Sequence, residues 1–234
     1  MVGDTPQQRH RYFLDWIDSA AGRRELDDRY RLLSADIAAQ ALRTETFLSR
    51  FARRLTADRA QLAPLFAHND APGRLLDFDC GLGDRHDHGG SVIDLRFEHG
   101  RALYKPRSLA MDGAYAVFLA HLAEHGIEPV QAAATTLDRG DHGYAAWIEH
   151  RPLADEQAAQ RYYHRYGGLA AIAYALACTD LHLENLIACG EYPIVIDLET
   201  VLQPWMTRAA ASQPPTRSIG PYAPSVVFSG LLPG

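Results

Sequence analysis

The stretch at residues 179–200, TDLHLENLIACGEYPIVIDLET, constrains this chain more than any other part of the sequence. A long apolar helical pattern precedes it, a polar loop opens it, and a short strand is predicted at residues 193–198. Asp180 and Asn185 lie on the loop, and Asp197 lies at the far end of the strand. Phosphoryl transfer uses these residue types. A carboxylate accepts the proton of the attacking hydroxyl, while an amide oxygen and a second carboxylate hold Mg²⁺ on the phosphates.

A structural interpretation of the same loop is open as well, because Asp and Asn side chains often cap helices and close turns. Asp180 by itself fits such a cap between helix and loop. Two features favour chemistry. Asp180 and Asn185 have the D-L-x-x-x-N spacing of a kinase catalytic loop, and the following strand returns the acidic residue Asp197 to that loop.

Lys105 is the one lysine among 23 basic residues, and all the others are arginine. A compact ammonium and a planar guanidinium bind different partners, so a lysine kept inside the tetrad Tyr-Lys-Pro-Arg at 104–107 is a candidate phosphate ligand. The alternative is a surface lysine retained by chance. Lys105 shares its strand parity with Leu103, so both side chains are predicted to face one cleft.

The order of apolar patterns predicts an α+β chain. Residues 9–67 have a helical pattern, with a break suggested by Gly22 and the charged run at 23–31, and residues 68–73 form the clearest boundary. A hairpin (91–97 and 102–105), a helix (111–125), a strand (143–149) and a second helix (157–178) follow. We predict a helical extension at 1–70, a β-rich region at 71–152, and a region at 153–234 that carries the catalytic loop and the metal-binding strand.

A glycine-rich loop is predicted at residues 81–90, GLGDRHDHGG, where four glycines allow close backbone approach to a ligand. It has neither the G-x-G-x-x-G pattern nor a Walker lysine. We expect it to cover a ligand, with Asp84 and His86 facing the site. A metal-ligand role for Asp84, His86 and His88 is the alternative, although the rest of a zinc site is not found in the sequence.

Composition excludes several other classes. A net charge of −6 gives no electrostatic case for nucleic acid or anionic membrane. No apolar run is long enough to span a bilayer, and the first residues lack the core of a signal peptide. The three cysteines are scattered and odd in number, which favours neither a disulfide framework nor a zinc knuckle. We expect a cytoplasmic protein.

Four segments taken together, GDRHDHGGSV, YKPRSL, TDLHLENLIACGEYPIVIDLET and SVVFSGLLP, resemble the dehydratase domain of class II lanthipeptide (lantibiotic) synthetases. The resemblance runs in the same order from about residue 41 to residue 234. It implies a two-lobed fold like lipid and protein kinases, with ATP and Mg²⁺ as cofactors and a ribosomally synthesised precursor peptide as substrate. In that family Ser and Thr are phosphorylated, and phosphate is then eliminated to leave a dehydrated residue.

The resemblance also implies residue roles near the nucleotide. Lys105 corresponds to the ligand of the ATP phosphates, with Arg107 and Glu199 beside the nucleotide. Asn185 and Asp197 correspond to the magnesium ligands.

Four further residues correspond to groups that act on the peptide. Asp180 orients or deprotonates the substrate hydroxyl, and His182 supports that loop or the phosphate. Asp84 and His86 match the family's glycine-rich loop, where such residues serve phosphorylation or elimination.

The resemblance has departures. The family's kinase-like lobe continues beyond SVVFSGLLP with further elimination residues, and a cyclase domain follows. We therefore expect an incomplete C-terminal lobe, in a fragment, in a split enzyme whose companion chain supplies the missing lobe and cyclase, or in a decaying copy. The phosphate-transfer residues are present, while the elimination set is incomplete. The rival interpretations are a small-molecule kinase of the aminoglycoside or choline kinase type, a non-catalytic pseudo-dehydratase that binds peptide, and a metallophosphoesterase suggested by residues 83–86.

Overall fold

The computed structural model describes residues 3–86, 90–202 and 226–232. The chain divides into two compact units, residues 1–58 with 85–90 and residues 59–84 with 91–234, and each is described by itself. The predicted domain boundaries at residues 70 and 152 stay predictions. No helix among the described residues is long and apolar enough to cross a membrane.

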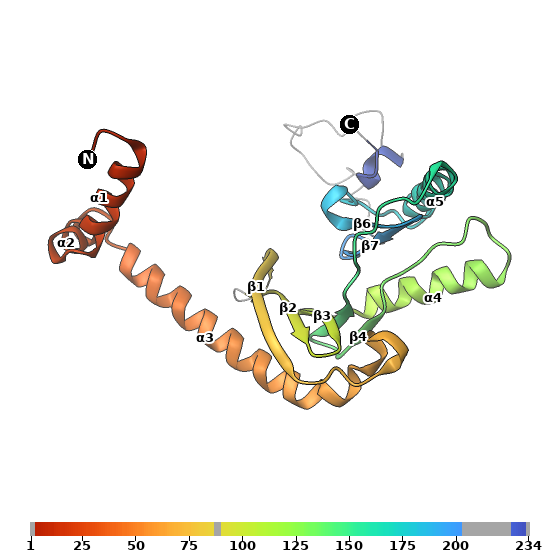
Figure 1. The fold of residues 1–234 in the computed structure, drawn as a ribbon, viewed down its shortest axis with the longest axis horizontal. Helices are drawn as coiled ribbons and strands as arrows, with labels where there is room; N and C mark the ends of the chain where they lie inside the picture. Colours follow the sequence, from red (N-terminus) through yellow and green to blue (C-terminus); the bar gives the residue numbers. More distant parts are fainter. Residues whose placement is uncertain (1–2, 87–89, 203–225, 233–234) are drawn as a thin grey trace, which may run out of the picture. The chain divides into compact units, whose positions relative to one another are not determined.

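The first unit contains α1 (Pro6–Asp18), α2 (Ala20–Arg29) and α3 (Leu33–Asp58) (Figure 1). Thr5 caps α1 through a capping box with Gln8, and Pro6 follows at the first helical position. Along α3, the predicted apolar positions Phe47, Phe51 and Leu55 are all buried, which confirms their four-residue spacing.

The helix break predicted from Gly22 and the charged run at 23–31 is confirmed at the end of that run, since α2 ends at Arg29 and α3 begins at Leu33, but Gly22 itself is not a break. A further break lies at Ser19, which ends α1 and caps α2 by accepting a hydrogen bond from the Gly22 amide. Gly22 lies inside α2, where a Cβ would come within 1.9 Å of the Trp16 carbonyl oxygen. Glycine is therefore required here for close packing of consecutive helices, and not as a helix breaker.

The second unit begins with short 3-10 turns at residues 59–69 and continues as a five-stranded sheet in the order β1-β2-β3-β5-β4. The strands are β1 (Leu75–His86), β2 (Gly90–Phe97), β3 (Gly100–Lys105), β4 (Thr136–Asp138) and β5 (Gly143–Ala146). The predicted hairpin is confirmed, since β2 and β3 pair antiparallel with Ile93 opposite Tyr104. The predicted strand at 143–149 is shorter and ends at Ala146.

The predicted glycine-rich loop at 81–90 is wrong for most of its length. β1 continues through Gly81 and Gly83 to His86, and β2 begins at Gly90. Gly81 and Gly83 take φ values of 96° and 67°, which a strand of ordinary residues would not adopt. Residues 87–89 lie outside the described part of the chain.

The sheet buries aromatic and branched side chains, as half-buried strands do. Tyr104 and Tyr144 stand opposite each other on β3 and β5, and their rings meet edge to face at 5.5 Å. Asp94 is buried on β2, where Arg101 donates to its carboxylate at 2.6 and 2.7 Å. A buried carboxylate needs such a partner to offset its desolvation.

The remainder of the second unit contains α4 (Ala110–Glu124), α5 (Glu156–Ala175) and a hairpin of β6 (Leu186–Cys189) and β7 (Tyr192–Val195). Both helices were predicted within a few residues of these bounds. Their shared core brings together Tyr115 and Leu119 of α4, Leu169 of α5, and Leu231 from the segment 226–232. Antiparallel sheets and helices together agree with the α+β class.

Candidate active site

Lys105, at the end of β3, joins the sheet to the segment that follows β7. Its ammonium Nζ donates a hydrogen bond of 2.6 Å to the carbonyl oxygen of Ile196, and the residue is only 8% exposed. Burial and the nearby Arg107 guanidinium lower the pKa of Lys105. Surrounding carboxylates oppose that shift without cancelling it. The site thus holds a poorly hydrated ammonium, which an anionic ligand would stabilise.

A narrow apolar cavity of about 40 Å³ lies beside Lys105. Leu103 and Lys105 both line it, which confirms the prediction that the two side chains face one cleft. The other lining residues come from α4, from the segment before β4, from β5 and the residues directly after it, from β6, and from the segment after β7: Asp112, Ala134, Ala145, Ala146, Trp147, Ile148, Ile187 and Ile196. Its walls are therefore mostly aliphatic, with an ammonium and a carboxylate at the polar side.

Trp147 has a fixed position at this cavity. The guanidinium of Arg101 stacks 3.3 Å from the centroid of the Trp147 ring, and the buried Asp94 carboxylate accepts two hydrogen bonds from the same guanidinium. Hydrogen bonds from Arg101 are the main reason that the pKa of Asp94 lies below its ordinary value. Asp94 and Arg101 therefore orient one wall of the cavity without lining it.

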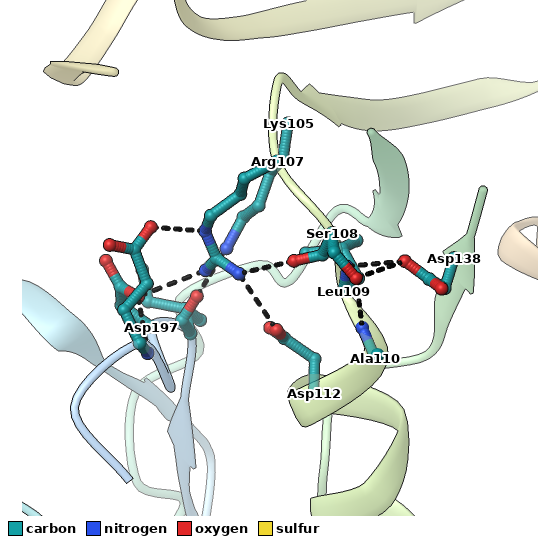
Figure 2. Close-up of polar contacts among 10 residues, drawn as sticks. Lys105, Arg107, Ser108, Leu109, Ala110, Asp112, Asp138 and Asp197 are labelled. Atoms are coloured by element: carbon teal, nitrogen blue, oxygen red, sulfur yellow. Dashed lines mark hydrogen bonds and ion pairs between the residues drawn. The ribbon is translucent and has the colours of Figure 1, made fainter. Parts of the chain in front are cut away.

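Arg107 connects three carboxylates that come from two parts of the chain (Figure 2). One Nη donates 3.1 Å to Asp112 Oδ2 on α4, and the other donates 3.0 Å to Asp197 Oδ1. The Nε atom pairs with Glu199. The guanidinium side chain is only 17% exposed, so these contacts lie largely away from bulk water.

The backbone around Arg107 is held by Asp138 of β4 (Figure 2). Its carboxylate accepts 2.6 Å from the Leu109 amide and 3.0 Å from the Ser108 hydroxyl. Desolvation acts to raise the pKa of Asp138, but these hydrogen bonds prevail and the pKa is lowered. Asp138 therefore fixes the turn that leads from β3 into α4.

The loop after α5 carries Asp180 on a left-handed backbone, with φ of 61°. Non-glycine residues adopt this conformation rarely, and Asp is among those that tolerate it best. The side-chain amide nitrogen of Asn185 donates a hydrogen bond of 2.9 Å to the backbone carbonyl of Asp180. The backbone carbonyl of Asn185 accepts a hydrogen bond of 3.0 Å from the backbone amide of Ile196. The loop is thus tied to the segment that Lys105 contacts, while the Asp180 side chain stays 63% exposed.

His182 faces the Asp180 carboxylate. Its Nδ1 accepts a hydrogen bond of 3.2 Å from the Glu184 amide, so the neutral ring carries its proton on Nε2. That Nε2 lies 3.6 Å from Asp180 Oδ1. This distance is longer than a hydrogen bond, so His182 lies next to the Asp180 carboxylate without binding it directly.

Asn185 and Asp197 carry the kinds of oxygen atom that Mg²⁺ binds together with substrate phosphates. The Asn185 amide uses its nitrogen toward the Asp180 carbonyl, so Oδ1 is the atom that it can offer a cation. Asp197 adds a partly exposed carboxylate. Within the described ranges, no cluster of three or more His, Cys, Asp and Glu is placed to hold a metal. Mg²⁺ commonly takes one or two carboxylates plus substrate phosphates, and does not need such a cage.

The model of DUF4135, a domain of unknown function, matches residues 30–234. This chain belongs to the DUF4135 family. The chain is also 26% identical over 246 residues to the lacticin 481/lactococcin biosynthesis protein LcnDR2 of Lactococcus lactis subsp. lactis. The match covers 100% of this chain and 26% of LcnDR2, so the chain spans about a quarter of that relative's length. The predicted resemblance is thus confirmed at the level of relation to a lantibiotic biosynthesis protein.

The DUF4135 chain brings most predicted site residues into contact. Lys105, Arg107, Asp197 and Glu199 meet directly or through Ile196. Asp180, His182 and Asn185 form the adjoining loop. Asp84 and His86 belong to strand β1, but the structure describes only their backbone and not their side chains.

Sequence reasoning missed Asp112, Asp138 and the pair of Asp94 with Arg101. Asp112 left a weak signal, because it is the one acid near the start of a helix whose sequence, AMDGAYAVFLAHLAE, is otherwise almost entirely apolar. Asp138 and Asp94 left no distinctive signal. Their partners lie on other strands or turns of the DUF4135 chain, which local pattern does not identify.

Proposed function

We propose that this chain transfers phosphate from ATP to Ser and Thr side chains of a precursor peptide in lantibiotic biosynthesis, on a kinase-like fold and with Mg²⁺. Phosphate elimination would then complete the dehydration. One observation carries the proposal: Lys105 and Arg107 converge on Ile196 and Asp197 from some ninety positions away in the sequence. The relation to LcnDR2 supports the biosynthetic class.

The lining of the cavity beside Lys105 agrees with a nucleotide base in its chemistry, but at about 40 Å³ the cavity is smaller than a base and would have to widen to admit one. Aliphatic walls and the oriented Trp147 ring suit a flat base. Lys105 lies at the polar side of that cavity, where its ammonium can exchange the Ile196 carbonyl for a phosphate oxygen. Because the ammonium is poorly hydrated, pairing with phosphate offsets a desolvation cost that folding has already imposed.

Asn185 Oδ1 and Asp197 are the groups that would hold Mg²⁺. When bound, Mg²⁺ neutralises charge on the phosphate oxygens and so favours transfer to a hydroxyl. Glu199 extends the acidic side of the site, since its amide donates 3.2 Å to Asp197 Oδ1 and its carboxylate pairs with Arg107.

Asp180 is the proposed acceptor of the substrate's hydroxyl proton. Its exposed carboxylate can reach an external Ser or Thr, and the His182 ring lies beside it. In the transfer, the hydroxyl oxygen bonds to the γ-phosphorus, the bond to ADP breaks, and the hydroxyl proton passes to Asp180.

Elimination must follow phosphorylation, because hydroxide is a poor leaving group and phosphate a good one. A base removes the Cα proton and phosphate departs as the Cα–Cβ double bond forms. Asp84 and His86 are proposed for this half of the reaction or for phosphorylation, on the resemblance alone.

The test is intact mass spectrometry of a candidate Ser- and Thr-containing precursor peptide, incubated with the chain, ATP and Mg²⁺. A gain of one phosphate mass per site supports transfer, and a loss of one water per site supports the full dehydration. Phosphorylation of choline or an aminoglycoside, with the peptide unchanged, would replace the proposal by the small-molecule kinase. Peptide binding with no nucleotide-dependent thermal shift would replace it by the non-catalytic interpretation.

A further inference from the structure

We propose that Asp112 is a positioning residue that divides the charge of Arg107 between itself and the pair Asp197 and Glu199, and thereby sets how tightly Asp197 binds a divalent cation. The inference rests on the proposed function, because it concerns the cation site of the same centre. Asp112 itself does not contact the cation. It acts through Arg107.

The geometry makes Arg107 a shared counter-ion (Figure 2). Its two terminal nitrogens point to different elements, one to Asp112 in the first turn of α4 and one to Asp197 after β7. Asp112 is the most buried of the three carboxylates, with a side chain 7% exposed against 36% for Asp197 and 38% for Glu199. The buried partner is the fixed one, and the exposed pair is accessible to a cation from solution.

A cation and a guanidinium compete for the same carboxylate oxygens. Arg107 neutralises Asp197 Oδ1 at 3.0 Å, so a divalent cation on Asp197 must weaken or displace that contact. The hold of Asp112 on Arg107 lowers the cost of this exchange, because the guanidinium keeps one carboxylate partner when it loses another. Asp112 should therefore favour cation binding, while Arg107 opposes it.

A purely structural role for Asp112 predicts something different. The turn that leads into α4 is already fixed by Asp138, which binds the Leu109 amide and the Ser108 hydroxyl. If Asp112 only anchored α4, its loss would lower stability without any selective effect on cation affinity. If Asp112 acted only as one more negative charge near the cation, replacing it would change the cation affinity by the same factor with or without Arg107.

The experiment measures Mn²⁺ binding to the whole chain by electron paramagnetic resonance of free Mn²⁺, with no nucleotide or peptide present. The variants are Arg107→Gln, Asp112→Asn and the double variant. Asp77→Asn is the matched control, because it removes one carboxylate that pairs with a different arginine, Arg96. Thermal unfolding of each variant separates loss of fold from loss of affinity.

We expect opposite signs from the two single variants. Arg107→Gln should tighten Mn²⁺ binding by about three- to tenfold, and Asp112→Asn should weaken it by a similar factor. On the Arg107→Gln background, Asp112→Asn should change the Mn²⁺ affinity less than about twofold, because the guanidinium through which Asp112 acts is absent. Asp77→Asn should leave the affinity unchanged.

Other results overturn the inference. An undiminished effect of Asp112→Asn on the Arg107→Gln background would make Asp112 a direct charge contributor. Wild-type affinity in both folded single variants would remove the counter-ion role while leaving the proposed function standing. Absence of Mn²⁺ binding by the wild-type chain without nucleotide would overturn this inference and leave the proposed function standing, because the proposed cation site there includes the nucleotide phosphates.

Discussion

The ammonium of Lys105 lies 2.6 Å from the carbonyl oxygen of Ile196, a residue 91 positions further along the chain. A neutral carbonyl is a weak partner for a buried ammonium, whose charge is better satisfied by an anion. The next residue after Ile196 is Asp197, and Arg107 binds it from the same turn that follows Lys105. Two short sequence motifs thus define the two sides of one charged centre.

Replacing Lys105 tests the nucleotide side of that centre. Lys105→Met should abolish the nucleotide-dependent thermal shift and lower phosphorylation of the peptide by at least about 100-fold, since it removes the charge that meets the phosphates. Stability without nucleotide should change by only about 1 kcal/mol, because removing a buried charge offsets the lost hydrogen bond.

Lys105→Arg is the matched variant for charge. A planar guanidinium does not replace a compact ammonium in a narrow buried space, so we expect it not to restore activity. Differential scanning fluorimetry and intact mass provide both readouts. Full phosphorylation by Lys105→Met would contradict the assignment of Lys105.

Replacing Asp180 tests the proton acceptor. Asp180→Asn should lower kcat by about 10²- to 10⁴-fold and leave the KM for ATP nearly unchanged, because the carboxylate acts on the hydroxyl and not on the nucleotide. The side chain is 63% exposed, so the variant should unfold within about 0.5 kcal/mol of the wild type. Steady-state kinetics and urea unfolding check the two halves. A large fall in stability would instead favour the helix-cap interpretation of Asp180.

The sequence predicted the elements better than their connections. Apolar spacing placed α3, α4, α5 and the hairpin of β2 and β3, since each pattern depends on neighbours a few positions apart. Gly22 and the glycines of β1 misled the prediction for one reason. Glycine marks either a chain break or a close backbone approach, and only the folded packing tells which applies.

The candidate site was predictable where residues lie in one motif and not where they act across motifs. The motifs at 104–107 and 179–200 identified Lys105, Arg107, Asp180 and Asp197. Asp112 and Asp138 act on Arg107 and its turn from other elements, and an acid with such a distant partner looks like any other in sequence. The kinase-like fold and the residue roles stay predictions.

The segment 226–232 supports the Asp180 loop, which makes a prediction about Gly230. The Ser229 carbonyl accepts 2.6 Å from the Leu181 amide, and a Cβ on Gly230 would lie 3.1 Å from the Leu181 nitrogen. Gly230 also has a φ of 81°. Gly230→Ala should therefore lower the free energy of unfolding by about 1–3 kcal/mol and reduce phosphorylation as the loop shifts.

Gly190→Ala is the control for that variant. Gly190 has a φ of 59°, but a Cβ there would meet nothing within 4 Å. It should show the conformational cost alone, about 1–2 kcal/mol, with phosphorylation intact. Urea unfolding and the mass assay compare the two variants. Equal activity losses in both would show that the contact with the Asp180 loop has no specific effect.

Asp94 makes a prediction about acid stability. Its folded pKa lies below the ordinary 3.8, mainly because Arg101 donates hydrogen bonds to the charged form. A carboxyl with a depressed folded pKa stabilises the protein above its unfolded pKa, and this contribution is lost as pH falls through the folded pKa. Unfolding free energy should thus decline below about pH 4.

Asp94→Asn should cost about 1–3 kcal/mol of unfolding free energy at pH 7, because Arg101 loses its charged partner, and should flatten the decline. Urea unfolding from pH 7 to pH 3 measures both effects. The decline involves other carboxyls as well, so the informative quantity is the difference between wild type and variant. That difference should shrink as the pH falls, and a constant difference would show that the Asp94 charge contributes nothing to stability.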